Sequence, residues 1–179
     1  MGLYSEALTT AMNLLSTDDR VIFLGQSVAV QGTSMRSTLE KVSDSQLLEL
    51  PVDEDFQMGI ANGMALAGYI PVSIFPRLNF MLLATNQIVN HLDKMSELAR
   101  SNPTPKVIIR TGIGSQIPLN PGPQHTGDFT EAFRLLCPNI NIVRLDDTNM
   151  IIPEYKKALS RTDGVSTILI EWSDRYNEK

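Results

Sequence analysis

The sequence predicts an α/β fold of three layers (α/β/α), with helices on both faces of a mainly parallel sheet. Along the whole chain, short apolar runs rich in β-branched residues alternate with longer segments whose apolar residues recur at helical spacing. Parallel strands joined through helices bury both faces of their sheet, and nearly all such crossovers are right-handed. The chain has 179 residues, 42% of them hydrophobic, which suits one well-cored domain over residues 1–179.

The first expected elements are a helix, a strand, a long loop and a second strand. Apolar residues recur at helical spacing over 5–15, and a buried strand is expected at 21–24, where Gly25 ends it. The segment 26–45 is polar and aperiodic, so we expect a long loop, which in compact domains is usually functional or mobile. A short strand over 47–50 then leads into the stretch around which the chain is organised.

That stretch runs from Pro51 to Gly68 and is predicted to be a buried helix. Pro51 and three acids begin it, and small and apolar residues follow for several helical turns. Within it, Glu54 lies beside the partial positive charge of the helix N-terminus, a position that suits acid/base chemistry. The alternative is that Asp53, Glu54 and Asp55 only cap and charge the start of the helix.

The second half of the chain continues the alternation of strands and helices. Asn102-Pro103 is expected to stop the longest helix, because the residue before a proline avoids helical backbone angles. The segment 112–127 is rich in glycine and proline and is expected to be a loop that leads to Asp128, a cap for the next helix. Residues 174–179 are expected to fray. In order, we expect strands at 70–75, 106–110, 140–143 and 167–172, and helices at 80–100, 130–136 and 153–159.

Composition and charge exclude several classes of protein. A net charge of -5 without any basic run argues against binding to nucleic acid or to an anionic membrane. Cys137 is the single cysteine and cannot form an intrachain disulfide, and the N-terminus lacks the pattern of a secretion signal, so we expect a cytoplasmic location. No apolar run approaches the roughly 20 residues that cross a bilayer. No Cys/His cluster suggests a metal site, so no metal ligand is expected in this chain.

A series of short motifs follows one another in the order typical of a known domain. The motifs are Glu54, Gly59-Ile60-Ala61-Asn62-Gly63-Met64-Ala65, Gln87-Ile88-Val89-Asn90, Lys94-Met95, Ile109-Arg110-Thr111, and His125 before Glu131-Ala132-Phe133. Together they resemble the pyrimidine-binding domain of the thiamine-diphosphate-dependent enzymes. The likeness is greatest to the beta subunit of the 2-oxo acid dehydrogenase decarboxylating component, and transketolase is a more distant relative. The resemblance spans residues 5–172 and implies the thiamine-diphosphate-binding fold.

The resemblance implies catalytic roles for Glu54 and His125. Glu54 would hydrogen-bond a pyrimidine ring nitrogen of thiamine diphosphate and exchange a proton with it, while the thiazolium ring serves as an electron sink. His125, on its glycine-rich loop, would contact the substrate carboxylate or pass a proton, since histidine titrates near neutral pH. The alternative for His125 is a surface residue without a function.

Two further residues would bind the cofactor together with Glu54. Phe80 matches the aromatic residue that stacks on the aminopyrimidine ring, and its alternative is ordinary core at the start of a helix. Val52 matches a position that contacts the same ring through its backbone or side chain, and its alternative is the core of a strand. The other histidine, His91, is expected to be structural or interfacial.

The chain lacks other parts of the enzymes it resembles. The diphosphate-binding motif, which resembles Gly-Asp-Gly followed by a paired asparagine, occurs nowhere in the sequence. From the resemblance we also expect the C-terminal domain of the beta subunit to be absent. The resemblance therefore implies a separate diphosphate-binding chain that supplies the Mg2+ ligands, in an alpha2beta2 heterotetramer. The reaction would be decarboxylation of a 2-oxo acid or two-carbon ketol transfer from a ketose. Pro76-Arg77, where the relatives carry glutamine-phenylalanine, implies a substrate other than pyruvate or branched-chain oxo acids.

Other interpretations stay open at this point. The chain could instead be a non-catalytic regulatory or scaffolding domain that kept the fold without the cofactor. An unrelated nucleotide-binding module is less favoured, because Gly112-Ile113-Gly114 lacks the third glycine of a dinucleotide fingerprint. Gly59, Gly63 and Ala67, spaced four apart, either let a partner helix cross closely or pack onto the chain's own sheet.

Overall fold

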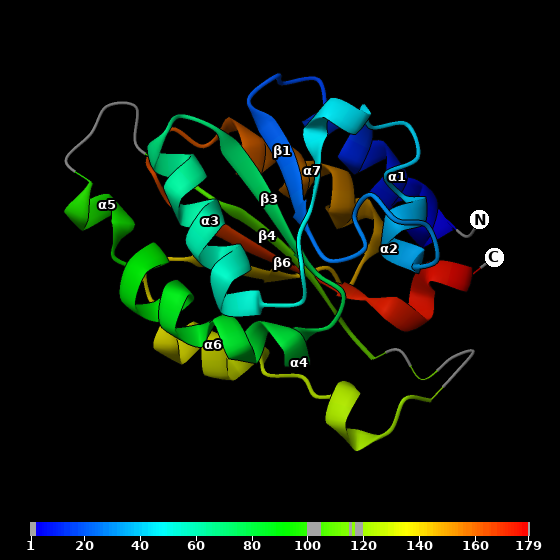
Figure 1. The fold of residues 1–179 in the computed structure, drawn as a ribbon. Helices are drawn as coiled ribbons and strands as arrows, with labels where there is room; N and C mark the ends of the chain where they lie inside the picture. The colour runs from blue at the N-terminus through cyan, green and yellow to red at the C-terminus, as the bar shows by residue number, and fades with distance from the viewer. Residues whose placement is uncertain (1–2, 100–104, 115, 117–119, 179) are drawn as a thin grey trace.

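The sheet at the centre of the molecule is parallel throughout. A computed structural model describes residues 3–99, 105–114, 116 and 120–178. The strands in this part of the chain form one sheet in the order β2-β1-β3-β4-β6-β5 (Figure 1). The strands are β1 (Val21–Gly25), β2 (Leu47–Glu49), β3 (Ile70–Phe75), β4 (Ile108–Ile113), β5 (Asn141–Arg144) and β6 (Thr167–Trp172). The predicted α/β class with a mainly parallel sheet is confirmed.

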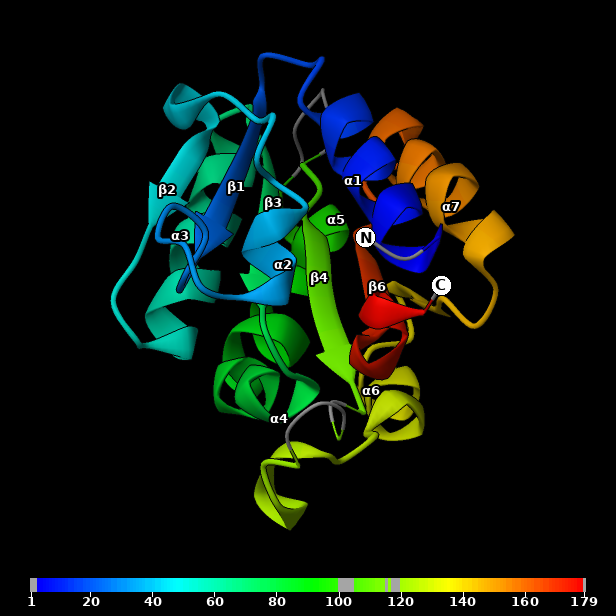
Figure 2. The ribbon, with the colours of Figure 1, turned by 90° about the vertical axis from the view of Figure 1, so that its right-hand side faces the viewer.

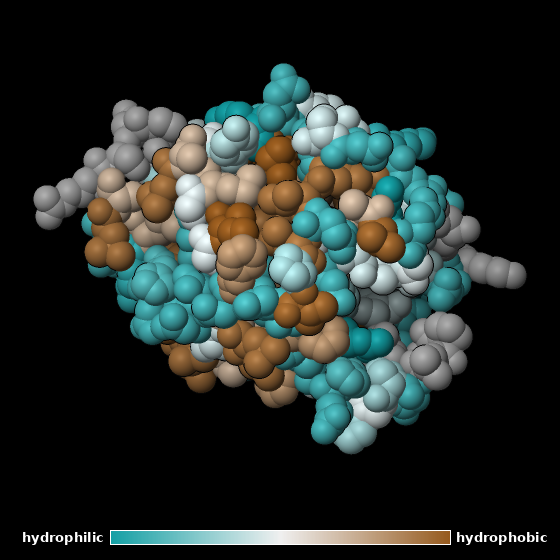
Figure 3. All heavy atoms as spheres, in the orientation of Figure 1, coloured by the Kyte–Doolittle hydropathy of each residue, from teal (hydrophilic) through white to brown (hydrophobic). Residues whose placement is uncertain are grey.

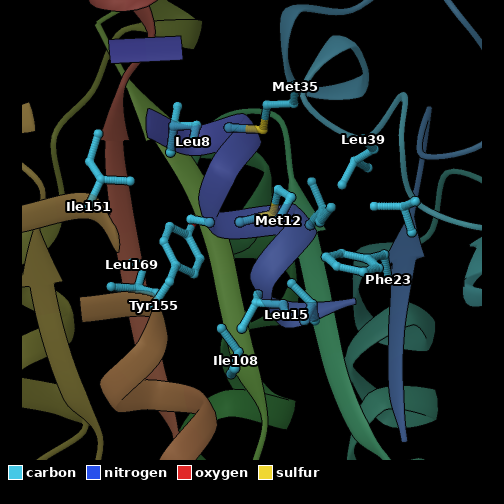
Figure 4. Close-up of a cluster of buried hydrophobic side chains, with 14 of the residues drawn as sticks. Leu8, Met12, Leu15, Phe23, Met35, Leu39, Ile108, Ile151, Tyr155 and Leu169 are labelled. Carbon is cyan, nitrogen blue, oxygen red and sulfur yellow. The ribbon is translucent and has the colours of Figure 1, made fainter. Parts of the chain in front are cut away.

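Helices cover both faces of this sheet, which gives the three predicted layers. α1 (Leu3–Leu15), α2 (Ser34–Ser37) and α7 (Thr148–Ser160) lie on one face, and α3 (Glu54–Leu66), α4 (Leu78–Met81), α5 (Met95–Leu98) and α6 (Thr130–Leu136) lie on the other (Figures 1 and 2). A separate apolar core fills each side. Figure 4 shows the core under α1 and α7, where Met12 and Tyr155 reach toward Phe23, Ile108 and Leu169 of the sheet.

The strand order places a topological switch point between β1 and β3. From β1 the chain moves outward to β2 at the edge of the sheet, and it then crosses over to β3 on the other side of β1. In open α/β sheets, ligands bind beyond the carboxyl ends of the strands at such a point, because the flanking connections there leave to opposite faces. The carboxyl edge near Gly25 and Phe75 is therefore where this fold places a site.

The prediction of one regular helix over 80–100 is wrong. The structure instead has an irregular helical run: α4, a 3-10 turn (Leu82–Ala84), a π-helical segment (Gln87–Leu92) and α5. Its buried positions explain the change of winding, since they are three apart over 78, 81 and 84 and then four apart over 84, 88 and 92. A tight 3-10 turn suits the first spacing and a wider π turn suits the second. The predicted stop at Asn102-Pro103 lies outside the described residues.

Three other expectations need correction. The 26–45 segment is not all loop, because α2 forms within it and buries Met35 against the sheet. α7 begins at Thr148, five residues before the predicted start, because Asp147 caps it; Pro153 lies inside the helix. Residues 174–179 were expected to fray, yet Ser173–Asn177 form a 3-10 helix anchored by the buried side chain of Tyr176.

Several smaller features complete the fold. β4 extends to Ile113, beyond the predicted end at residue 110, and α6 has the predicted bounds. Cys137 is buried at the end of α6, as expected for a core residue. Among the described residues, no helix is both long enough and apolar enough to cross a membrane.

Candidate active site

The start of α3 is fixed against the carboxyl end of β3. Gln57 donates from Nε2 to the Ser73 hydroxyl at 2.9 Å and to the Ile74 carbonyl at 3.0 Å. Gly25, at the end of β1, has a φ of +147°, and a Cβ there would lie 2.5 Å from the Ile74 carbonyl oxygen. Only glycine therefore fits where β1, β3 and α3 meet. This close packing sets where the first turn of α3, and with it Glu54, lies relative to the switch point.

The three acids at the start of α3 differ in what they bind. Asp53 is the N-cap residue, and its Oδ1 accepts from the Phe56 amide at 3.0 Å. Asp55 accepts from Nε2 of Gln87 at 3.3 Å. Glu54 is half-buried, and within the described ranges its carboxylate has no hydrogen-bond or ion-pair partner. Capping is thus performed by Asp53, which leaves the Glu54 carboxylate free for a ligand beside the positive end of the helix.

Val52 is not part of a strand core. It follows β2 rather than lying in it, and its side chain is 67% exposed. Phe56, one helical turn further along, is 49% exposed. The alternative interpretation of Val52 as strand core is therefore wrong, and its side chain is open to a ligand or to another chain.

The structure brings Phe80 and His125 together. Phe80 lies in α4 and His125 ends a 3-10 turn (Pro123–His125), and their ring centroids are 5.6 Å apart with the planes at 62°. Both side chains are half-buried, so Phe80 is not ordinary core and His125 is not a fully exposed surface residue. The Nδ1 atom of His125 is buried and has no hydrogen-bond partner among the described residues. An orphaned ring nitrogen of this kind is available to a ligand.

Two residues of the segment that begins α4 hold the His125 loop in place. Arg77 donates from Nη1 to the His125 carbonyl at 3.3 Å, and Oδ1 of Asn79 accepts from the Gly127 amide at 3.2 Å. A Cβ on Gly127 would lie 2.6 Å from the Phe129 ring, so a larger residue there would require that ring to move. The loop that carries His125 is therefore positioned by the residues around Phe80.

Asp128 anchors the far end of the same loop. Its carboxylate accepts from the Thr130 amide at 2.9 Å and from Arg144 at 3.1 Å. Burial by itself raises the pKa of Asp128, but the hydrogen bonds from Thr130 and the charge of Arg144 outweigh burial and lower the pKa overall. The predicted cap needs correction: the N-cap residue of α6 is Phe129, and Asp128 lies one residue earlier, where its side chain accepts from the Thr130 amide.

The predicted site residues thus form two groups at one edge of the sheet. Val52 and Glu54 lie at the start of α3, while Phe80 and His125 lie on α4 and on the loop after β4; the beginning of α3 and α4 are at the same end of the molecule in Figure 1. Across the described residues, no hydrogen bond or ring contact joins Glu54 directly to Phe80 or His125. A ligand placed between the two groups would connect them.

Sequence reasoning missed the residues that position the site. Gln57, Asn79 and Arg77 make the contacts described above, yet none of them was a candidate site residue. A signal existed for Arg77 and Asn79, because polar residues directly after a buried parallel strand lie at the carboxyl edge where ligands bind. Gln57 carried no such signal, because a glutamine in a helix is usually solvated.

The surface beside the site is unusually apolar. Large exposed apolar side chains on α3 and the helical run after it are Phe56, Leu66, Leu82, Leu83 and Leu98. Figure 3 shows apolar side chains gathered on this side of the molecule, over α3 and toward α4. Exposed apolar patches of this kind mark interaction surfaces. We call these five residues the α3 apolar face.

A pocket of about 460 Å3 opens between α3 and residues 87–99. Gly59 and Gly63 line it, together with His91 and Met95. A Cβ on Gly63 would meet nothing within 4 Å, so this glycine does not pack onto the chain's own sheet, and that alternative is wrong for it. The small residues of α3 instead border an open groove that adjoins the α3 apolar face.

The described residues contain no group of three or more His, Cys, Asp or Glu side chains arranged to hold a metal ion. The acids nearest the site have other partners or stand singly: Asp53 caps α3, Asp55 binds Gln87, and Asp128 binds Thr130 and Arg144.

The chain is similar to known proteins along most of its length. The family model described as the pyrimidine-binding domain of transketolase matches residues 3–177. The chain is 32% identical over 149 residues to pyruvate dehydrogenase E1 component subunit beta of Cyanidium caldarium, covering 80% of this chain and 44% of that protein. It is 29% identical over 147 residues to 3-methyl-2-oxobutanoate dehydrogenase subunit beta of Mycobacterium tuberculosis strain H37Rv, covering 77% and 40%.

A solved structure shares the fold. It is described as a split gene transketolase, inactive beta4 tetramer, with a TM-score of 0.59 and 18% identity, covering 94% of this chain and 49% of that chain. The chain thus spans less than half the length of the curated relatives it matches.

Proposed function

Because the chain belongs to the transketolase pyrimidine-binding domain family, we propose that it supplies the pyrimidine-binding half of a thiamine-diphosphate-dependent active site. The observation that carries this proposal is the unpartnered Glu54 carboxylate at the start of α3, at the same sheet edge as the Phe80–His125 pair. The proposed reaction is decarboxylation of a 2-oxo acid or two-carbon ketol transfer from a ketose.

The residues present fit thiamine diphosphate. The Glu54 carboxylate is unpaired, the Phe80 ring is half-exposed, and Val52 is open at the start of the same helix. We propose that Glu54 hydrogen-bonds the pyrimidine ring, that Phe80 stacks on it and that Val52 contacts its edge. When bound, the cofactor supplies a thiazolium ring that accepts the electron pair released from the substrate.

The chain's own residues would then handle protons and water. Glu54 would hold a proton on its carboxylate and return it. His125 would offer its orphaned Nδ1 to the substrate. The apolar surroundings of Phe80 would exclude water from the proton transfers.

We propose that a second chain completes the site. It would bring the diphosphate-binding residues and the Mg2+ ligands, and the assembly would be an alpha2beta2 heterotetramer. The α3 apolar face and the groove beside Gly63 support this proposal. Exposed apolar side chains are stabilised when another chain covers them and removes them from water. The relative described as a split gene transketolase is consistent with a site divided between chains.

Substitution of Glu54 by glutamine tests the proposal. Glutamine keeps the size of the side chain but cannot cycle a proton, so hydrogen–deuterium exchange at the thiazolium carbon should fall about a hundredfold or more. The measurement uses the complex with the partner chain and magnesium. If Glu54 only charges the helix N-terminus, the substitution should cost at most about 1 kcal/mol of stability and leave exchange at the thiazolium carbon unchanged.

Asp55→Asn is the matched control. It removes one negative charge from the same helical turn, at an exposed residue that binds only Gln87 among the described residues, and exchange should stay near that of the parent. Equal exchange in Glu54→Gln and the parent would overturn the role of Glu54. Absence of exchange in the parent complex would favour the regulatory or scaffolding alternative.

A further inference from the structure

Arg77 is an unpaired cation at the carboxyl edge of the sheet. It lies two residues after β3, in the position that precedes α4, and its side chain does not cap that helix. The side chain turns instead toward the His125 loop, where Nη1 donates to the His125 carbonyl at 3.3 Å. Arg77 is half-buried, and this hydrogen bond places its guanidinium beside the backbone of the His125 loop.

This lack of an anionic partner is unusual in the molecule. Six described arginines each pair with a carboxylate: Arg20, Arg110, Arg134, Arg144, Arg161 and Arg175. Arg77 has no carboxylate partner among the described residues, and Arg36, a buried residue of α2, is the other one without such a pair. A guanidinium has five N–H donors, and the carbonyl of His125 accepts from one of them. Among the described residues, the remaining donors have no anionic partner.

We propose that Arg77 binds a second anionic group of the substrate, one that is distant from the reacting carbonyl. The inference rests on the proposed function and defines its substrate class as a dianion: either a 2-oxo dicarboxylic acid or a phosphorylated ketose. The planar fork of arginine matches carboxylate and phosphate oxygens in a bidentate way.

The chemistry of decarboxylation distinguishes this second anionic group from the carboxylate next to the reacting carbonyl. A 2-oxo acid loses the charge of its own carboxylate as carbon dioxide leaves. A guanidinium bound to that carboxylate would stabilise the ground state more than the transition state and would slow the reaction. A cation at the site is therefore better used on a charge that persists throughout the reaction, such as a distal carboxylate or a phosphate.

Kinetics of Arg77→Gln in the assembled complex test the inference with paired substrates. The acid pair is 2-oxoglutarate and 2-oxobutanoate, and the sugar pair is fructose 6-phosphate and fructose; only the first member of each pair carries the distal anion. We expect the parent to prefer the dianion in one pair, which identifies the source of the anion. Arg77→Gln should lower kcat/KM for that dianion about ten- to a hundredfold more than for its partner, because any loosening of the His125 loop affects both members of the pair alike.

Two further variants separate recognition from structure. Arg77→Lys keeps the charge without the fork and should recover part of the preference. Arg20→Gln makes the same change of charge at an arginine paired only with Asp18, and it should leave the preference unchanged. Calorimetric binding of glutarate against butyrate, neither of which can react, should show the same loss in Arg77→Gln.

The outcomes are distinguishable from failure of the proposed function. Exchange at the thiazolium carbon in the parent, without preference for either dianion, overturns the assignment of Arg77 and leaves the proposed function standing. An equal loss for both members of each pair in Arg77→Gln makes Arg77 a support for the His125 loop and also overturns the inference. Absence of exchange in the parent overturns the proposed function and the inference with it.

Discussion

Asp53, Glu54 and Asp55 are neighbours in the sequence, yet the fold separates them into three environments. Asp53 accepts from a backbone amide, Asp55 accepts from Gln87, and Glu54 keeps its carboxylate unpartnered. Sequence reasoning left open whether all three acids cap the helix, because each of them is a residue type that favours a helix N-terminus. The geometry assigns capping to the residue whose φ of -156° and ψ of 95° lie outside the helix.

Substitution of His125 by alanine is expected to impair turnover and to spare cofactor binding. The imidazole faces Phe80 and has an unpartnered Nδ1, while the residues proposed to contact the cofactor are Val52, Glu54 and Phe80. General acid/base steps are commonly worth about a hundredfold or more, so kcat should fall by that order. Steady-state kinetics combined with cofactor titration of the assembled complex measure both quantities.

The matched control for His125 is its neighbour Gln124, which is exposed on the same turn. Gln124→Ala should change neither quantity. If His125→Ala turns over as fast as the parent, His125 is a surface residue without a catalytic role. A loss of cofactor affinity in His125→Ala would instead show that the imidazole supports the Phe80 ring.

At the scale of elements, a buried ionic network joins segments that are far apart in the chain. Arg110 of β4 donates to Glu171 of β6 at 2.6 Å, and the two side chains have no exposed area. Arg110 also donates to Thr38 at 2.9 Å, and both Tyr155 and Tyr176 donate to the Glu171 carboxylate. Burial alone lowers the pKa of Arg110, but the charge of Glu171 outweighs it and the pKa is raised. The network ties the 26–45 segment and the 173–177 helix to the sheet.

Replacement of Arg110 by methionine should therefore destabilise the domain by about 3–5 kcal/mol, because it leaves the Glu171 carboxylate buried without its cation. Urea unfolding of the isolated chain measures the change. Arg134→Met is the control, since Arg134 pairs with Glu131 at the surface and its side chain is 43% exposed; its loss should be below about 1 kcal/mol. Similar losses for the two variants would contradict a structural role for the buried network.

At the scale of the whole molecule, the chain presents one end of a sheet and one apolar face to other molecules. The start of α3, α4 and the His125 loop converge on the carboxyl edge, and the α3 apolar face lies beside them (Figures 1 and 3). The residues proposed to contact the pyrimidine ring lie at that edge. The exposed α3 apolar face beside them supports the proposed division of the cofactor between two chains.

The isolated chain is accordingly expected to bind thiamine diphosphate weakly. Contacts to the pyrimidine alone forgo the charge-assisted hydrogen bonds that the diphosphate and its metal would make. Calorimetry on the purified chain with magnesium should give no binding at micromolar cofactor, and addition of the diphosphate-binding chain should restore it. Micromolar or tighter binding without a partner chain would contradict the divided site.

The sequence by itself determined the fold class, the family resemblance and most element positions. β3 and α6 have the predicted bounds, and Glu54 is the first residue of α3, because apolar periodicity, turn residues and caps act over a few neighbouring positions. The irregular run after β3 was beyond such reasoning, since its winding follows the spacing of the residues that the sheet buries.

Only the tertiary structure decided which distant residues meet. Phe80 and His125 contact each other across 45 positions (125 − 80), Arg110 pairs with Glu171 across 61, and Arg77 reaches the His125 loop across 48. These contacts depend on strand order and on the length of the connecting segments, which no local pattern encodes. The sequence could therefore nominate Glu54 and His125 singly. The folded chain alone shows that His125 lies against Phe80 and beside an unpaired Arg77, because non-local contacts form only when the sheet brings the carboxyl ends of its strands to one edge.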